Sequence, residues 1–145
     1  MKRLLVASLL CVILVGAVPG FHGAPPSIDS QVVFLYYRDI NAAADFYGRT
    51  LGLEQTFDRG WVKIYETSAS SYVGLVDEAR GMHQVAESKP VMLSIVTTEV
   101  DAWHRYLEAE GVPISSGLND SADAPIRSFV VKDPGGYTVE FFQWR

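Results

Sequence analysis

The chain has 145 residues, of which 48% are hydrophobic and 20% charged, and its net charge is −5. This length suits one globular domain and excludes two independent hydrophobic cores. The acidic balance, without a basic cluster, argues against nucleic acid as a partner, because binding to phosphates depends on Lys and Arg.

The first segment, residues 1–24, has the pattern of a signal peptide. Lys2 and Arg3 precede an apolar run over residues 4–18, which is shorter than the about 20 residues that cross a bilayer. We expect this segment to be either a cleaved signal peptide or an uncleaved N-terminal membrane anchor, the one predicted contact with a membrane. The protein is therefore predicted to be exported, to a periplasmic or extracellular location.

Removing residues 1–24 leaves an acidic domain without cysteine. The segment holds two of the twelve basic residues and none of the seventeen acidic ones, so the remainder has a net charge of −7. It also holds Cys11, the single cysteine of the chain. The predicted domain, residues 30–145, therefore offers neither a disulfide nor a thiolate ligand for a metal.

The first half of the domain reads as strand, helix and three strands. Residues 31–37 are aromatic and β-branched, Asp39 can cap a following helix, and Gly52 ends that helix. Helical spacing places four residues on one side of the helix: Ile40, Ala43, Tyr47 and Leu51. The three further strands are predicted over residues 53–57, 61–66 and 72–76. We call this half module one, about residues 30–78.

The second half repeats this order and forms module two, about residues 90–145. Residues 91–96 predict a strand, and Thr98 with Asp101 predicts a capping box at the start of a helix that ends near Gly111. Three more strands are predicted over residues 112–115, 127–132 and 137–143. Each half is too small to bury its own sheet face, so the two modules are expected to pack on each other.

Two motifs resemble those of a known family. The first is Asp39-Ile40 with Phe46-Tyr47 and Leu51-Gly52-Leu53, and the second is Asp133-Pro-Gly-Gly-Tyr-Thr-Val-Glu140. They are similar to the first-helix signature and the closing turn and strand of the vicinal oxygen chelate superfamily, which includes glyoxalase I, extradiol dioxygenases and bleomycin-resistance proteins. This resemblance implies a glyoxalase-like α+β fold, with two βαβββ modules that form curled mixed sheets around a central cleft.

The resemblance also implies where a divalent metal would bind in this fold. Metal-dependent members use one residue from the first strand and one from the fourth strand of each module. Those positions fall on Val32, Gly74, Val91 and Glu140, so only one donor remains. A divalent ion needs about three or four protein donors, and we therefore predict a metal-independent protein without a cofactor. The alternative is a partial metal site of Glu140 with His83, to which Gln31 adds a further donor.

Strand alternation predicts an apolar lining of the cleft with one acid in it. Glu140 and Phe142 share one side of the last strand, and the resemblance implies that this side faces the cleft. The predicted ligand-binding residues are Glu140, Phe142, Phe34, Tyr36 and Leu93. Such a lining favours a small apolar or aromatic molecule. Glu140 can equally be a remnant of the family pattern, satisfied by a neighbouring hydroxyl, and no catalytic residue is assigned.

Three functions follow as hypotheses. The first is an exported protein that binds a small apolar or aromatic molecule without a metal. The second is a metal-dependent lyase or dioxygenase with a degenerate site, and the third is an interaction protein with a filled cleft. A homodimer is expected, with Trp61 and Trp144 as candidate contacts. Whether the protein catalyses a reaction stays open at this point, and a metal-dependent enzyme is the less favoured reading.

Overall fold

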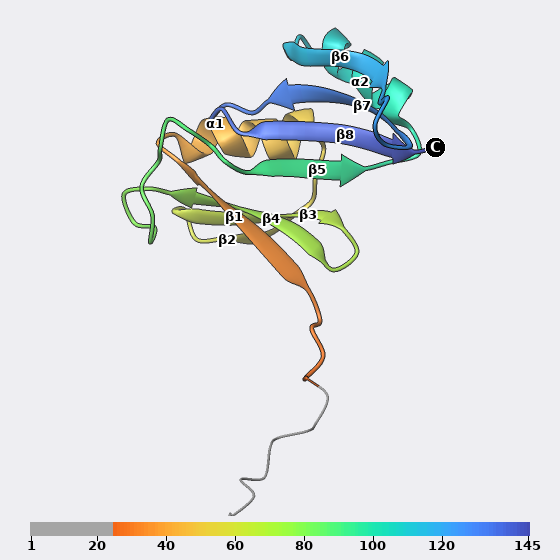
Figure 1. The fold of residues 1–145 in the computed structure, drawn as a ribbon. Coiled ribbons are helices and arrows are strands. Elements are labelled where there is room, and N and C mark those ends of the chain that lie inside the picture. Colours follow the sequence, from red (N-terminus) through yellow and green to blue (C-terminus); the bar gives the residue numbers. More distant parts are fainter. Residues whose placement is uncertain (1–24) are drawn as a thin grey trace, which may run out of the picture.

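Figure 1 shows the computed structural model, which describes residues 25–145. The predicted signal segment lies outside the described residues. Module one contains β1 (Gln31–Tyr37), α1 (Ile40–Ala44), the π-helical turn η1 (Asp45–Thr50), β2 (Gln55–Asp58), β3 (Val62–Ser68) and β4 (Ser71–Asp77). Module two contains β5 (Met92–Val96), α2 (Val100–Ala109), β6 (Ile114–Asp120), β7 (Ile126–Lys132) and β8 (Thr138–Trp144). The predicted order of elements is confirmed.

Each module forms one four-stranded mixed sheet. The strand orders are β1-β4-β3-β2 and β5-β8-β7-β6, so both sheets have the same topology. The first strand of each module pairs in parallel with its last, and the other pairs are antiparallel. The sheets do not close into a barrel, and the predicted α+β class with two βαβββ modules is confirmed. Among residues 25–145, no helix combines the length and the apolar character needed to cross a membrane.

The first helix begins as predicted but changes character after one turn. The Asp39 carboxylate accepts hydrogen bonds from the backbone N–H groups of Asn41 and Ala42, both at 3.0 Å. From residue 45 the chain widens into η1, where the Leu51 N–H donates to the Phe46 carbonyl at 2.8 Å. This wider turn allows two adjacent aromatic residues, Phe46 and Tyr47, both to be buried.

The predicted capping box at the second helix is wrong. Glu99 occupies the N-cap position without a side-chain hydrogen bond, and α2 begins at Val100. The Asp101 carboxylate instead accepts two hydrogen bonds from the Arg127 guanidinium on β7, at 2.9 and 3.0 Å. A bidentate pair of opposite charges is stronger than a neutral cap, so this contact between two elements replaces the local one.

One hydrophobic core lies between the two modules. In every strand alternate side chains point to opposite faces, and the helix-bearing faces of both sheets contribute to the same cluster. In Figure 1, α1 lies on the side of the module-one sheet that faces module two. The Tyr106 hydroxyl on α2 also donates to the Thr50 carbonyl at 2.9 Å. The helix-bearing faces are therefore turned toward each other.

A buried carboxylate joins the modules across this core. Asp133 is only 5% exposed, and its Oδ2 accepts hydrogen bonds from the Tyr37 hydroxyl at 2.6 Å and the Tyr47 hydroxyl at 3.0 Å. Its Oδ1 accepts from the backbone N–H groups of Gly135 and Tyr137 at 2.9 and 2.8 Å. Four donors satisfy the charge, so Asp133 fixes the β7–β8 turn against β1 and η1.

Candidate functional site

The opposite faces of the two sheets carry no helix, and we call them the first and second open faces. The first, on module one, carries Phe34, Tyr36, Ile64, Gly74 and Val76. The second, on module two, carries Ser94, Val96, Glu140, Phe142 and Trp144. Since the helix-bearing faces share one core, these faces point away from it. Phe34 and Glu140 therefore lie on different faces.

A hollow of about 840 Å³ lies on the first open face. Its floor comes from β3 and β4, where Val62 and Val76 are buried, and Phe34 stands 47% exposed above it. The lining residues, almost all apolar, are Phe34, Tyr36, Phe57, Trp61, Val62, Ile64, Val76, Arg80, Gly81 and Met82. All of them belong to module one or to the segment that follows β4.

Two close contacts shape this hollow. A Cβ atom at Gly74 would lie 2.3 Å from Cδ1 of Phe34, so the aromatic ring rests directly on the β4 backbone. A Cβ atom at Gly81 would lie 2.7 Å from Cε1 of Tyr36, which brings the segment after β4 against β1. The two glycines therefore let aromatic rings pack where a side chain would otherwise stand.

The rim of the hollow carries polar groups. The exposed His83 ring packs edge-on against Tyr36, with 5.2 Å between the ring centroids. The Arg80 guanidinium carbon lies 5.3 Å from the centre of the Trp61 ring. Both residues belong to the segment after β4. Of the two, only His83 is a candidate site residue from the sequence.

Glu140 lies on the second open face, away from this hollow. Its Oε2 accepts a hydrogen bond from the Ser94 hydroxyl on β5 at 2.8 Å, and its neighbour on β7 is Val130. The predicted ligand-binding set is thus divided. Phe34 and Tyr36 line the hollow, whereas Glu140 and Phe142 belong to the second open face.

The predicted orientation of Leu93 is wrong. In the parallel pairing of β5 and β8, Ser94 stands beside Glu140 and Leu93 beside Val139. Val139 is fully buried, and Leu93 packs against the hydrophobic core with it. The sequence placed Leu93 on the Glu140 side, and an offset of one residue in a strand exchanges its two faces. Ser94 is the residue that takes the predicted place of Leu93.

The residues present do not fit a divalent metal ion held by one chain. Glu140 forms a row across the sheet with its paired neighbours on the adjacent strands, Ser94 and Val130. The equivalent row of module one consists of Phe34, Gly74 and Ile64. Only one of these side chains is a carboxylate, and none is an imidazole. Within residues 25–145 no three His, Cys, Asp or Glu residues group together in a way that could hold an ion.

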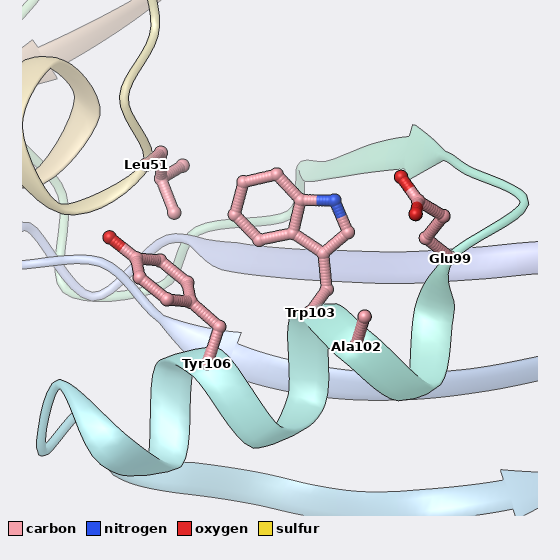
Figure 2. Close-up of a pocket in the computed structure, with 5 residues that line it drawn as sticks. All are labelled: Leu51, Glu99, Ala102, Trp103 and Tyr106. Atoms are coloured by element: carbon pink, nitrogen blue, oxygen red, sulfur yellow. The ribbon is translucent and has the colours of Figure 1, made fainter.

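Figure 2 shows a second hollow, of about 340 Å³, between α2 and the end of η1. Trp103 and Tyr106 project from α2 toward Leu51, and Glu99 stands at the start of the helix. The Trp103 ring stacks on Phe141, with centroids 5.0 Å apart. These side chains hold α2 against the core. We therefore assign the hollow in Figure 2 to helix packing.

Solved structures share this fold. A lactoylglutathione lyase from Agrobacterium tumefaciens is 23% identical, with 83% of this chain and 96% of that chain covered and a TM-score of 0.66. A glyoxalase/bleomycin resistance protein/dioxygenase from Nocardioides is 19% identical, with 85% and 87% covered and a TM-score of 0.70. TioX from Micromonospora sp. ML1 is 20% identical, with 80% and 98% covered and a TM-score of 0.67. At these identities the likeness establishes the fold alone.

The paired βαβββ modules define a glyoxalase-like protein. Residues 30–141 match the model of the Glyoxalase/Bleomycin resistance protein/Dioxygenase superfamily. No curated protein sequence matches this chain. The chain belongs to the glyoxalase/bleomycin resistance protein/dioxygenase superfamily, as the motifs around Asp39 and Asp133 predict.

Proposed function

We propose that this protein binds a small apolar or aromatic molecule in the hollow on the first open face. The observation that carries the proposal is the hollow itself, about 840 Å³ with an almost wholly apolar lining. Ligand sites commonly have volumes of about 300–1,000 Å³ and apolar walls. Phe34 and Phe57 are both partly exposed there, so a ligand that covers them removes apolar surface from water.

A fluorescence titration with the neutral probe N-phenyl-1-naphthylamine tests this proposal. Ile64 stands beside Gly74 on the first open face, and Val130 stands beside Glu140 on the second. Ile64→Trp fills the hollow, so we expect the probe to bind at least about tenfold more weakly. Val130→Trp makes the same change on the other face and leaves binding unaltered. Equal effects of the two variants, or binding lost only in Val130→Trp, would overturn the proposal.

In this proposal binding requires no metal. The support is the row Ser94, Glu140 and Val130, which holds one carboxylate. We expect added Zn²⁺, Ni²⁺, Fe²⁺ or Mn²⁺ to leave the melting temperature unchanged, because a bound ion would stabilise the folded state. The rival reading, a lyase or dioxygenase with a degenerate metal site, requires stoichiometric metal after dialysis that Glu140→Ala abolishes. That result would replace the present proposal.

The proposed protein is exported and works as a homodimer. The basic and apolar pattern of residues 1–24 supports export. Recovery from the periplasm or medium of a bacterial host, with N-terminal sequencing of the recovered chain, tests it. After cleavage we expect the recovered chain to begin beyond residue 18, whereas a membrane-associated chain with an intact N-terminus identifies an anchor.

Exposed apolar side chains on the second open face support a dimer and favour a role for this surface in pairing.

A further inference from the structure

We propose that the hollow on the first open face selects anionic ligands, and that Arg80 binds their acidic group. The ligand class is an apolar or aromatic body that ends in a single carboxylate, sulfonate or similar anion. This inference rests on the proposed function, since it specifies the ligand of the same hollow. It concerns a residue that neither the family motifs nor the predicted binding set includes.

Arg80 provides the charge of this site. Among the described lining residues it is the only charged one, and the remaining walls are aromatic, aliphatic or glycine. Its guanidinium carbon lies 5.3 Å from the centre of the Trp61 ring. An arginine stacked on an aromatic ring uses the face of its guanidinium, so its in-plane N–H groups stay available as donors.

The carboxylates nearest in sequence are already engaged elsewhere. Glu78 pairs with Arg38 at 3.5 Å and accepts a hydrogen bond from the Val85 N–H at 2.8 Å. The Asp77 Oδ1 accepts from the Ala79 N–H at 2.9 Å. In the part of the chain that the structure describes, no ion pair or side-chain hydrogen bond involves Arg80. A ligand anion would therefore not have to displace a partner.

The surroundings of Arg80 make this charge selective. A hydrogen bond between a guanidinium and an anion is stronger than one between neutral groups, and apolar walls weaken the competition from water. The domain beyond residue 24 has a net charge of −7, so its long-range field repels anions. Preference for an anion must then come from a local cation at the hollow. It should also weaken as salt screens the pair.

Two probes that share one aromatic body separate charge from hydrophobic binding. They are N-phenyl-1-naphthylamine, which is neutral, and 8-anilino-1-naphthalenesulfonate, which adds one sulfonate. We expect Arg80→Gln to weaken binding of the sulfonate probe about fivefold and to leave the neutral probe within twofold, since an exposed pair contributes up to about 1 kcal/mol. Decanoate should likewise displace the neutral probe better than decanol from the wild type, but not from Arg80→Gln.

Arg59→Gln is the matched control. Arg59 also lies over an aromatic ring, 5.5 Å from the centre of Phe57, and its loss changes the net charge equally, but it lines no part of the hollow. An equal loss of sulfonate binding in Arg59→Gln and Arg80→Gln would overturn the anion preference, as would no loss in either. The proposed function would still stand if Ile64→Trp abolishes neutral-probe binding. Failure of the neutral probe to bind in the hollow would instead overturn both.

Discussion

The ring of Phe34 covers Gly74, and the two residues form a pair across β1 and β4. They stand opposite each other in the parallel register, and a Cβ atom at Gly74 would come within 2.3 Å of Phe34 Cδ1. Gly74 is also the position at which the family resemblance implies a metal ligand. A carboxylate side chain at residue 74 would clash with the present position of the Phe34 ring. Glycine at this position therefore both removes the metal donor and leaves room for the aromatic wall that Phe34 forms.

We expect Gly74→Ala to destabilise the fold and to weaken probe binding. Glycine in a strand costs roughly 0.5–1 kcal/mol relative to alanine, whereas overpacking a filled site costs about 1–3 kcal/mol. The overpacking should therefore dominate, with a lower urea midpoint. In a Phe34→Ala background the same change should cost less, because the clashing ring is gone. A double-mutant cycle by urea denaturation measures this coupling.

Gly117→Ala on β6 is the control for this cycle. A Cβ atom there meets nothing within 4 Å, so alanine should be neutral or slightly stabilising. If Gly74→Ala is as stable as Gly117→Ala, the Phe34 ring does not depend on the space above Gly74. Phe34 would then not be held over Gly74 as a wall of the hollow.

The buried carboxylate of Asp133 should be essential for stability. In Asp133→Asn an amide nitrogen would face either the hydroxyls of Tyr37 and Tyr47 or the backbone N–H groups of the turn, and one set of donors would lose its acceptor. An unsatisfied buried group costs about 1–3 kcal/mol, so we expect a loss of about 3 kcal/mol in the free energy of unfolding. Asp123→Asn, on an exposed loop residue, should cost almost nothing. Similar losses in both variants would contradict a special role for Asp133.

Stability should also fall at alkaline pH. Burial raises the pKa of Tyr37 and Tyr47 above the ordinary value of about 10, and the nearby charge of Asp133 raises both further. Above about pH 10 the unfolded chain releases these protons while the folded chain keeps them, so the unfolded state is favoured increasingly. The contribution is fully present below pH 10 and is lost as pH rises toward the folded-state values.

The slope of stability against pH measures this effect. Urea denaturation above about pH 10 should give a steep decline in the wild type and a shallower one in Tyr47→Phe, which removes one of the two groups. Tyr65, whose pKa burial also raises, contributes in the same direction and remains in the variant. A free energy of unfolding that does not change with pH in this range would show that both hydroxyls ionise as readily in the folded state as in the unfolded state.

The motifs predicted the fold well because they encode local geometry. The Asp39 cap and the stops at Gly52 and Gly111, both with positive φ, depend on neighbouring residues only. The prediction for Leu93 was wrong because side chains in a strand alternate between two faces. A short apolar run does not place the first residue of the strand to within one position, and an error of one position exchanges the faces. The capping box predicted from Thr98 and Asp101 was wrong because Arg127, from a strand distant in sequence, binds the Asp101 carboxylate.

The candidate site was predicted less well because it depends on how the modules pack. Hydrogen bonds from Tyr37 and Tyr47 to Asp133 turn the helix-bearing faces together and leave Phe34 and Glu140 on different faces. No pattern among neighbouring residues indicates such contacts between residues that are far apart in the sequence. Arg80 gave no signal either, because its place at the hollow follows from the close approach of Gly81 to Tyr36. Strand alternation predicted Phe34 and Tyr36 as lining residues, but it did not predict the contribution of β3 or of the segment after β4 to the hollow.

The second open face should pair with another copy of the chain. Val96 and Trp144 are 57% and 65% exposed there, and Phe142 packs edge-on against Trp144. A stable dimer buries about 800 Å² per partner, and an apolar sheet face can supply part of this area. We expect the purified protein to have the mass of a dimer by light scattering, and Trp144→Asp to shift it toward the monomer. Ile28→Asp, at an exposed apolar residue before β1, should remain dimeric, and a wild type that is monomeric at tens of micromolar would disprove the pairing.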